Sequence, residues 1–564
     1  MVDYKKVYET WANDEFFDQK TRDELKAIAG DEGEIKDRFY QELEFGTAGL
    51  RGKLGAGTNR MNVYMVAKAS QGFADTIVAE GQEAMDRGVV ICHDVRHMSE
   101  EFSKIAAEVF AANGIKVHIF KDIQPTPVCS YAIRYLKTIA GVMVTASHNP
   151  REYNGYKAYW ADGSQILEET ANKILTNMKK YDDYSKIKRL DFEKGLEDGI
   201  IEWIDDQLIE DYVDEVMACA INDDIDKDVN IVYSPLNGCG NKLVRRILDQ
   251  RGFSNIHVVK EQENPDPDFS TVGYPNPEDP KAFAYSEKLG EEVGADLLLA
   301  TDPDSDRCAV EVKNENGEYI FLTGNEIGTL LTNYILSQLK AKGELKENSA
   351  VVKSLVSTDM VKPIAKAYGV DVYEVLTGFK NIYEVANKFE AEGKGNFVFG
   401  FEESIGYNYK DFVRDKDAVN SAMLISEMTG YYKKQGKTLL DVLEDLYEEY
   451  GYYATNVISI VLEGLDGQER IGRIMDSVRK NPLEELAGLK VEKIVDYLND
   501  DTGLSKSNVL KYYFTDKSWF ALRPSGTEPK IKLYVNAIGS SEEESQDKLK
   551  QIVKEMREVI DGVE

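Results

Sequence analysis

The sequence predicts an α/β protein with three tandem α/β domains, each with a mixed or parallel sheet, followed by a C-terminal α+β domain. Three observations predict this class. The chain has 564 residues, enough for about four domains of typical size. From about residue 63 to 450, short β-branched runs alternate with longer amphipathic segments, as in proteins with parallel sheets. After residue 450 this alternation ends, which indicates a smaller domain of another architecture.

Domain I, residues 1–205, is expected to begin with a helical extension, because acidic, basic and aromatic residues recur at helical spacing near the start. Residues 45–62, FGTAGLRGKLGAGTNRMN, hold five glycines and predict a loop whose backbone approaches another group closely. Strands are predicted at 89–94, 116–120 and 140–147, and a helix that begins at Ser99 separates the first two.

The same alternation predicts domain II at 206–315 and domain III at 316–450. The expected strands are 230–235, 256–259 and 295–302 in domain II, and 350–357, 371–377 and 397–403 in domain III. Residues 261–280 contain five prolines and predict an irregular insertion within domain II. Domain IV, 451–564, has predicted strands at 456–463 and within 519–540, and an acidic helix from about 541.

Composition excludes several functions. The 68 Lys and Arg residues against 100 Asp and Glu give a net charge of −32, which repels nucleic acid. Any phosphate site must therefore concentrate arginine, lysine and backbone N–H groups locally.

Five cysteines without a C-x-x-C pair indicate neither a disulfide framework nor a zinc site. The start has no apolar leader and no run reaches a membrane span, so we expect a cytoplasmic protein without a membrane partner. The oligomeric state is not predicted.

Each α/β domain has a strand that leads directly into a polar loop. These loops are TASHNP, TDPDSDR and FEESIG, and each follows an apolar run. In open α/β sheets, ligands bind at the carboxyl ends of strands. We therefore expect the three loops to meet in one cleft.

The second loop has three carboxylates at alternate positions, Asp302, Asp304 and Asp306. Oxygen ligands with this spacing can converge on one hard cation and suit Mg²⁺. An EF-hand is excluded, because Arg307 and Lys313 stand where it needs Gly and Glu. Arg307 offers an anion contact. Two alternatives remain: a solvated acidic turn, and an aspartyl phosphatase of the haloacid-dehalogenase type with Asp302 as nucleophile, although Asp306 departs from that motif.

In the first loop, Ser147 follows a buried strand and has His148 and Asn149 beside it. A serine hydroxyl is a weak nucleophile unless a base or a metal lies within reach. The alternative is a strand-ending turn whose serine caps a helix. The motif alone does not decide between catalysis and turn formation.

The third loop, FGFEESIGY at 399–407, offers Glu402 and Ser404, and TGFK at 377–380 lies at the end of another predicted strand. A carboxylate and a hydroxyl are suited to bind sugar hydroxyls. A glycosidase pair of Glu402 and Glu403 is disfavoured, because neighbours on a strand point to opposite faces. Downstream, VRDKDAV has Lys416 between two aspartates.

Residues 523–532, RPSGTEPKIK, concentrate cations and hydroxyls in a strongly acidic chain. Hydroxyls, a glycine-permitted nest of N–H groups and a guanidinium are what a phosphate dianion needs. The segment is not a Walker A loop, so nucleotide hydrolysis is not indicated. The alternative is an ordinary proline-flanked turn.

Taken in order, FGTAGLRG, TASHNP, DPDSDR, TGFK, FEESIG, RDKDA and RPSGTEPK resemble the motifs of the α-D-phosphohexomutase superfamily, in its phosphoglucomutase and phosphopentomutase branch. The resemblance covers nearly the whole chain from about 40 to 560. It implies a four-domain protein with the active site in a central cleft and one essential loop from each domain.

The resemblance also implies roles for residues. Ser147 is the expected phosphoserine, which also joins the Mg²⁺ ligands Asp302, Asp304 and Asp306. General acid–base or phosphate-orienting roles are implied for Arg51, His148 and Lys416. Expected substrate contacts are Arg307, Thr377, Gly378, Glu402 and Ser404, and the loop for the non-reacting phosphate is Arg523, Ser525, Gly526 and Thr527. Ala418 stands where relatives often have Gly, which affects the expected reach of Lys416.

The activity implied is that of an isomerase-class mutase. It interconverts glucose 1-phosphate and glucose 6-phosphate with Mg²⁺ and with glucose 1,6-bisphosphate as intermediate and primer. Phosphopentomutase, phosphomannomutase and glucose 1,6-bisphosphate synthase are alternatives within the superfamily. The aspartyl phosphatase and a non-catalytic sugar-phosphate-binding protein are the alternatives outside it.

Overall fold

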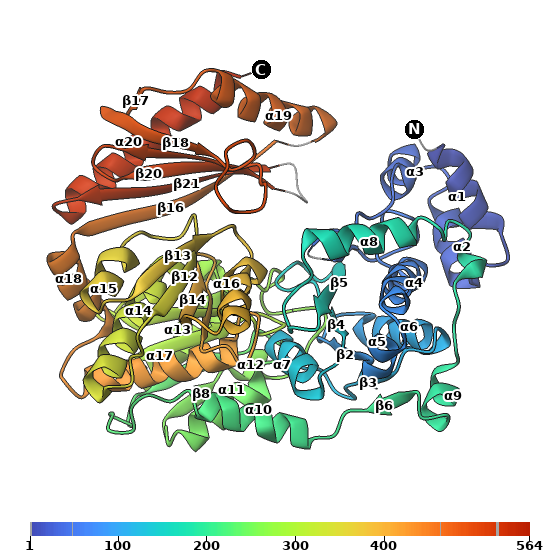
Figure 1. Cartoon of the computed structure of the whole chain (residues 1–564), viewed down its shortest axis with the longest axis horizontal. Helices are drawn as coiled ribbons and strands as arrows, with labels where there is room; N and C mark the ends of the chain where they lie inside the picture. Colours follow the sequence, from blue (N-terminus) through green and yellow to red (C-terminus); the bar gives the residue numbers. More distant parts are fainter. Residues whose placement is uncertain (1–2, 48, 463, 526–529, 564) are drawn as a thin grey trace. The chain divides into compact units, whose positions relative to one another are not determined.

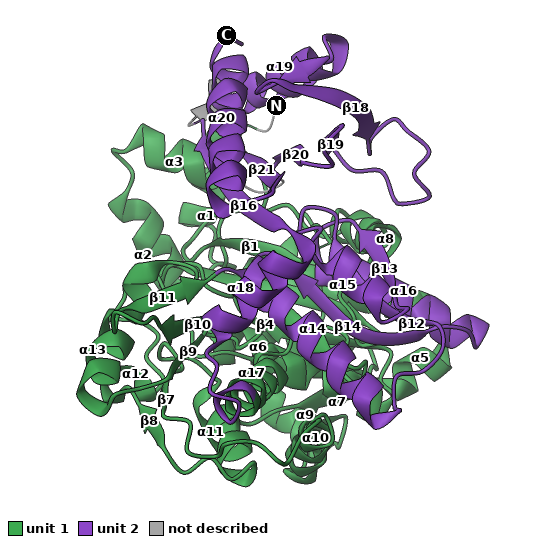
Figure 2. Ribbon diagram, turned by 90° about the vertical axis from the view of Figure 1, so that its left-hand side faces the viewer, with its two compact units in different colours: residues 1–322, 406–431 green, residues 323–405, 432–564 purple. Residues whose placement is uncertain are grey.

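The computed structural model describes residues 3–47, 49–462, 464–525 and 530–563, drawn in Figure 1. The chain divides into two compact units (Figure 2). The first contains residues 1–322 and 406–431, and the second contains residues 323–405 and 432–564. Mixed or parallel sheets occur in the first three predicted domains and an antiparallel sheet in the last, which confirms the predicted fold class.

Three short helices form the N-terminal extension, as predicted. They are α1 (Tyr4–Asn13), α2 (Gln19–Ala27) and α3 (Glu32–Phe39). An aspartate precedes each helix and accepts a hydrogen bond from a backbone N–H of its first turn. Such N-caps satisfy donors that the helix itself leaves unpaired. Trp11 stacks on Phe17 with ring centroids 4.4 Å apart, and both belong to the apolar core of domain I.

The domain I sheet has the order β1-β5-β4-β2-β3-β6. The strands β4, β2, β3 and β6 run parallel, whereas β5 is antiparallel to both β4 and β1. The bounds are β1 (Leu50–Lys53), β2 (Val89–His93), β3 (Val117–Ile119), β4 (Ala140–Val144), β5 (Tyr153–Trp160) and β6 (Ile201–Trp203). The helices are α4 (Val63–Ala79), α5 (Gln82–Arg87), α6 (Ser99–Ala112), α7 (Thr126–Leu136), α8 (Glu168–Met178), η1 (Tyr184–Lys186) and α9 (Phe192–Glu197).

The glycine-rich stretch contains a strand where the sequence predicts only a loop. Strand β1 pairs with β5, and Arg51 lies opposite Gly155. A Cβ on Gly155 would lie 2.5 Å from the carbonyl oxygen of Thr145 and 2.8 Å from that of Leu50. Glycine is therefore required on β5, where the backbone passes close to both neighbouring segments.

Domain II has a mixed sheet of order β11-β10-β9-β7-β8. The parallel part was predicted, and the antiparallel strands β10 and β11 extend it. The strands are β7 (Ile231–Ser234), β8 (Ile256–Val258), β9 (Leu297–Thr301), β10 (Cys308–Lys313) and β11 (Tyr319–Leu322). The helices are α10 (Gln207–Met217), α11 (Asn241–Gln250), α12 (Lys260–Glu263), η2 (Pro280–Phe283) and α13 (Ala284–Val293). The predicted insertion is irregular between α12 and η2. The domain boundaries stay predictions.

The second unit contains a parallel arrangement β13-β12-β14 and the antiparallel sheet β16-β21-β20-β19-β18-β17. Its strands are β12 (Ser349–Ser354), β13 (Asp371–Val375), β14 (Asn396–Glu402), β16 (Tyr452–Val461), β17 (Glu485–Leu486), β18 (Leu489–Asp496), β19 (Leu510–Phe514), β20 (Trp519–Pro524) and β21 (Lys530–Gly539). Its helices are α14 (Gly324–Lys342), α15 (Val361–Ala367), α16 (Phe379–Glu392), α18 (Leu439–Tyr450), α19 (Gly464–Lys480) and α20 (Glu542–Asp561).

Strand β15 (Gly406–Tyr409) and most of helix α17 (Ala418–Lys433) belong to the first unit. Both lie within residues 316–450, the predicted domain III. Lys416 lies between these two elements and is thereby part of the first unit. Among the helices that the structure describes, none combines the length and the apolar character of a membrane span.

Candidate active site

Ser147 lies just beyond strand β4 in a strained conformation. Its side chain is buried, with 3% of its surface exposed, and its φ angle is 54°. The left-handed region costs a residue with a Cβ roughly 1–2 kcal/mol. The backbone N–H of Ser147 donates to Thr145 Oγ1 at 2.8 Å, which supports this turn. The turn allows the serine side chain to point towards the loop that follows β9.

The serine hydroxyl makes two contacts. Ser147 Oγ donates to Asp302 Oδ2 at 3.0 Å and lies 3.1 Å from His148 Nδ1. The serine loop and the aspartate loop, predicted separately from the sequence, are thus in direct contact. The arrangement can exchange a proton with the imidazole and can hold a cation beside the serine oxygen.

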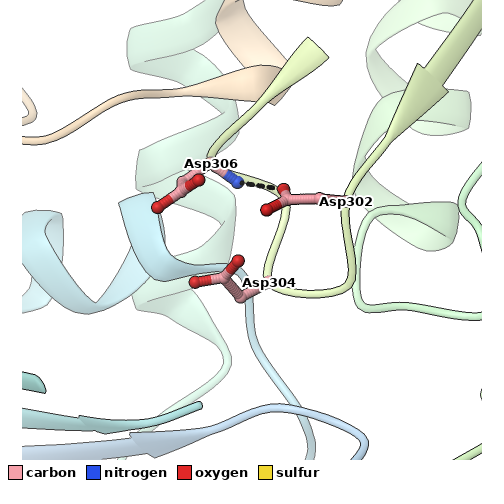
Figure 3. A group of neighbouring side chains, drawn as sticks. All are labelled: Asp302, Asp304 and Asp306. Carbon is pink, nitrogen blue, oxygen red and sulfur yellow. Dashed lines mark hydrogen bonds between the residues drawn. The ribbon is translucent and has the colours of Figure 1, made fainter. Parts of the chain in front are cut away.

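The three aspartates form one buried cluster (Figure 3). Each offers an oxygen within 4.8 Å of the others. Asp302 Oδ1 accepts the backbone N–H groups of Asp306 at 3.1 Å and of Arg307 at 3.0 Å. These two hydrogen bonds close the loop after β9 and turn its side chains inward. A solvated acidic turn, one of the two alternatives for this motif, does not describe a buried cluster.

Two lysines compensate the charge of the cluster. Lys157 Nζ on β5 donates to Asp304 Oδ2 at 2.7 Å and to Asp306 Oδ2 at 3.0 Å. Lys416 Nζ lies 3.2 Å from Asp306 Oδ2 and 3.1 Å from Asp415 Oδ1. Lys416 was predicted. Lys157 was not predicted, although it closes the motif GVMVTASHNPREYNGYK, and its position at the end of that motif is the only signal in the sequence.

The aspartates differ in their proton affinity. Burial and the neighbouring carboxylates of Asp304 and Asp306 raise the pKa of Asp302 well above its ordinary value. Burial also opposes ionisation of Asp306, but Lys157, Lys416 and Arg307 outweigh it and lower the pKa of Asp306. A cation bound among the three carboxylates would favour the charged form of Asp302.

The cluster fits a divalent cation. Within the described part of the chain, Asp304 Oδ1 and Asp306 Oδ1 are buried without a hydrogen-bond partner. Buried acceptors of this kind are rare unless an ion or water satisfies them. Carboxylate oxygens are the ligands that Mg²⁺ prefers, and three protein ligands leave room for others. The three aspartates can therefore hold a metal.

Further cationic groups lie around the serine. Arg51 on β1 donates from Nη1 to Asn149 Oδ1 in the serine loop at 3.3 Å. Arg307 Nη1 lies 3.8 Å from Glu278 Oε2. Burial first, and then the charges of Arg307 and Arg51, lower the pKa of His148 well below its ordinary value. The imidazole is therefore neutral near neutral pH.

The predicted sugar-binding residues lie in the second unit, where two of them are in contact. The backbone N–H of Gly378, at φ 112°, donates to Glu402 Oε1 at 2.6 Å. Thr377 accepts a hydrogen bond from Asn381 through its carbonyl at 2.9 Å. Ser404 follows in the turn after β14. The loops at 377–378 and 402–404 are thus adjacent.

Glu403 has a different environment from Glu402. Its Oε2 accepts from Ser354 Oγ at 2.8 Å and from Ser357 Oγ at 3.2 Å. The two neighbouring carboxylates thus have separate partners. This supports the argument against a glycosidase pair.

The predicted phosphate loop connects β20 and β21. Arg523 lies opposite Lys532 in the strand pair, and the N–H of Ser525 donates to the carbonyl of Lys530 at 2.8 Å. Arg523 and Ser525 are half-buried. The predicted residues Gly526 and Thr527 lie outside the described residues.

Fold and site together define the class of protein: a multidomain α/β protein in which a buried serine contacts a loop of three carboxylates that can hold a metal. Four family models match the chain, namely the phosphoglucomutase/phosphomannomutase α/β/α domains I (42–185), II (210–317) and III (323–450) and the C-terminal domain (473–559). The chain belongs to the phosphoglucomutase/phosphomannomutase family. The predicted superfamily is thereby confirmed.

Relatives with curated names support the same conclusion. A phosphoglucomutase of Staphylococcus haemolyticus is 36% identical over 521 residues, with 90% of this chain and 93% of the relative covered. A phosphoglucomutase of Staphylococcus aureus is 37% identical over 528 residues, with 89% and 91% covered. The prediction of a mutase of the isomerase class is confirmed at this level.

Solved structures share the fold. A putative phosphomannomutase from Thermus thermophilus has a TM-score of 0.68 at 22% identity, with 92% of this chain and 99% of that chain covered. The phosphoglucomutase parafusin from Paramecium has a TM-score of 0.69 at 18% identity, with 92% and 96% covered. At these identities the likeness concerns the fold alone.

Proposed function

We propose that the protein interconverts glucose 1-phosphate and glucose 6-phosphate by way of a phosphoserine at Ser147. The observation that carries this proposal is the 3.0 Å hydrogen bond from Ser147 Oγ to Asp302 in the aspartate loop. This contact supports a metal site beside the serine hydroxyl. The neighbouring imidazole of His148 supports proton transfer to and from the same oxygen. The two staphylococcal relatives named phosphoglucomutase support glucose as the sugar.

Asp302, Asp304 and Asp306 would hold Mg²⁺, and Ser147 would join them through its phosphate. When bound, the cation supplies charge stabilisation for the transferring phosphoryl group. Arg307, Arg51 and Lys416 add positive charge around the same oxygens. A chain with a net charge of −32 repels phosphate, so a phosphate site in it requires a local concentration of cations of this kind.

Each half-reaction moves one phosphoryl group. The bond between phosphorus and Ser147 Oγ breaks, a bond to the free hydroxyl oxygen of the sugar phosphate forms, and the hydroxyl proton passes to the serine oxygen. The 3.1 Å distance from His148 Nδ1 to Ser147 Oγ supports His148 as the carrier of that proton. The resulting glucose 1,6-bisphosphate turns round and returns its other phosphate. The same bisphosphate primes the unphosphorylated enzyme.

The proposed substrate contacts other than Arg307 belong to the second unit. Thr377, Gly378, Glu402 and Ser404 would bind sugar hydroxyls, because carboxylate and hydroxyl oxygens accept and donate in fixed directions. The non-reacting phosphate would be held by a guanidinium and a set of hydroxyl and N–H groups. The residues of that loop are Arg523, Ser525, Gly526 and Thr527.

We also propose a cytoplasmic location with small sugar phosphates as partners. The five cysteines are all buried and free, as expected in a reducing compartment. The net charge of −32 argues against nucleic acid as a partner.

The test is a comparison of turnover on glucose 1-phosphate, mannose 1-phosphate and ribose 1-phosphate, with Mg²⁺ and a trace of glucose 1,6-bisphosphate. We expect glucose 1-phosphate to give the highest kcat/KM. A clearly higher value for ribose 1-phosphate or mannose 1-phosphate would overturn the choice of glucose. Peptide mass spectrometry adds a second criterion. Phosphate on Ser147 supports the mutase, whereas phosphate on Asp302 and none on Ser147 supports a phosphatase.

A further inference from the structure

The guanidinium of Arg96 donates hydrogen bonds to four backbone carbonyls of the serine loop. It follows strand β2 and is buried, with 3% of its surface exposed. One terminal nitrogen donates to the carbonyls of Ser147 at 2.6 Å and Asn149 at 2.5 Å. The other donates to the carbonyls of Pro150 at 2.9 Å and Tyr153 at 3.1 Å. A single guanidinium thus fixes both ends of the loop 147–153.

This loop needs external support, because Ser147 has a φ angle of 54°. A residue with a Cβ remains in the left-handed region only where its surroundings impose it. The N–H of Ser147 is held by Thr145 Oγ1 and its carbonyl by Arg96. The two peptide groups that set this conformation are therefore both restrained.

Arg96 is itself held in place by polar contacts. Its Nε lies 3.3 Å from Asp94 Oδ2, so all three guanidinium nitrogens face an oxygen. Asp94 Oδ1 in turn accepts the backbone N–H of Arg96 at 3.0 Å and the hydroxyl of Ser99 at 2.7 Å. A buried ion pair is screened little by solvent. The contacts to Asp94 thus hold the guanidinium in place independently of the serine loop.

An aromatic ring from the proline-rich insertion covers the guanidinium. The ring centroid of Phe269 lies 5.0 Å from the central guanidinium carbon of Arg96, a cation–π distance. Phe269 is fully buried, and the preceding Asp268 lies 3.0 Å from His97 Nε2. The insertion at 261–280, for which no role was predicted, thus contacts the segment that supports the serine.

We propose that Arg96, fixed by Asp94 and covered by Phe269, is a positioning residue that holds Ser147 in the conformation needed for phosphoryl transfer. The inference rests on the proposed function, since it assigns a support to the phosphoserine of that reaction. Arg96 contacts only main-chain carbonyls of the loop and therefore acts through Ser147, without contact to the reacting atoms.

The test compares Arg96→Met and Arg96→Lys with the control Arg87→Met. Arg87 also donates to two backbone carbonyls of domain I, those of Lys137 at 2.9 Å and Thr138 at 3.1 Å, but in another loop. In Arg96→Met we expect kcat to fall at least 100-fold, while KM for glucose 1-phosphate and the Kd for Mg²⁺ change less than threefold. The kcat of Arg96→Lys should lie between those of wild type and Arg96→Met, because the lysine ammonium has three donors for four carbonyls. Arg87→Met should retain kcat within twofold.

A milder variant tests the same inference if Arg96→Met does not fold. Phe269→Leu keeps an apolar side chain under the guanidinium but removes the ring face, and we expect kcat to fall three- to tenfold with unchanged KM. If Arg96→Met does not fold, Arg96→Lys and Phe269→Leu decide the question. A kcat within threefold of wild type in Arg96→Met, or in both milder variants when it does not fold, overturns the proposal.

Hydrogen exchange separates this inference from the proposed function. Amides in the loop 147–153 should exchange at least tenfold faster in Arg96→Met than in wild type or Arg87→Met. If the wild-type protein shows no mutase activity, the proposed function fails, and the exchange result alone decides the positioning role. Unchanged exchange in Arg96→Met contradicts it.

Discussion

Two lysines from different elements neutralise the aspartate loop. Lys157 on β5 bridges Asp304 and Asp306, and Lys416 reaches Asp306 from the segment before α17. The motif RDKDA singles out Lys416, because this lysine stands between two aspartates in the sequence. Lys157 lies in a strand without β-branched residues, YNGYKAYW, and only the folded sheet brings it to the aspartates.

Replacement of Lys157 by Met should destabilise the first unit unless a cation is bound. Removal of one partner from a buried ion cluster typically costs about 3–5 kcal/mol, because the remaining carboxylates are left uncompensated. Mg²⁺ should restore part of this loss and so stabilise the variant more than the wild type. Denaturant unfolding of both proteins, with and without Mg²⁺, measures the difference. Equal stabilisation of the two by Mg²⁺ would contradict the assignment of Lys157 to the metal cluster.

Replacement of Ser147 by Ala should abolish turnover while substrate still binds. Alanine also has a Cβ, so the left-handed backbone conformation at φ 54° costs it as much as serine. It has no oxygen to carry the phosphoryl group. We expect kcat to fall on the order of 10³–10⁶-fold, as for loss of other nucleophiles. Steady-state kinetics and calorimetric binding of glucose 6-phosphate check this.

The matched control for this variant is Ser103→Ala. Ser103 is a buried serine on α6 whose hydroxyl donates to the carbonyl of Ser99 at 2.9 Å. It removes a buried hydroxyl from the same domain without touching the serine loop, and kcat should be retained. Near-normal turnover in Ser147→Ala would remove the phosphoserine from the mechanism.

At the level of single elements, the sequence predicts the parallel strands except β6, and it predicts the loops at their carboxyl ends. Strands β4 and β9 are buried and apolar, and their ends bring Ser147 and Asp302 together. Strands β1, β5, β10 and β11 are not predicted. They add to the sheets in antiparallel fashion, and β1 and β5 carry glycine and polar residues without a clear period. The partner of β1 lies about a hundred residues away in the sequence, which a local pattern does not contain.

A buried charge cluster links sheet elements within the second unit. Lys511 on β19 is fully buried, donates to the carbonyl of Leu355 at 2.5 Å and lies 3.5 Å from Glu374 on β13. Its Nζ lies 4.0 Å from the ring centroid of Trp519 on β20. Lys353 on β12 also contacts Glu374, at 2.9 Å. Burial lowers the pKa of Lys511 to about 8, although Glu374 opposes the shift.

The stability of the second unit should therefore rise with pH in a defined window. The ordinary pKa of a lysine is about 10.4, so above pH 8 the unfolded chain binds a proton that native Lys511 has lost. Stability rises with pH wherever the unfolded state binds more protons. Lys511 should contribute about 2 kcal/mol between pH 7 and about pH 9.5.

Denaturant unfolding of wild type and Lys511→Met across this range isolates the effect. The difference in free energy of unfolding between the two proteins should change in favour of wild type as pH rises. A difference that is independent of pH, or one that changes in the opposite direction, would show that Lys511 is not deprotonated in the native state.

Across the whole molecule, a strongly acidic chain carries its proposed phosphate-binding groups in a few loops. Cations gather around the aspartate cluster of the first unit and again at Arg523, Lys530 and Lys532 of the second, against a net charge of −32. Overall repulsion makes nonspecific binding of anions unfavourable, so only sites with several donors bind them. The sequence predicts such sites where basic residues cluster in a chain with an excess of Asp and Glu.

The division into two compact units predicts where a metal stabilises the protein. All proposed Mg²⁺ ligands, Asp302, Asp304, Asp306 and Ser147, belong to the first unit. A ligand that binds only the native state stabilises it by about 2.7 kcal/mol at one hundred times its Kd. Mg²⁺ should therefore slow hydrogen exchange in strands β2, β4, β7 and β9 and leave the exchange of β12, β19, β20 and β21 unchanged. Asp304→Asn should remove the protection, because the variant lacks one ligand charge, while its second unit still exchanges as in wild type. Protection that extends equally to both units, or that survives in Asp304→Asn, would mean that the cation binds elsewhere.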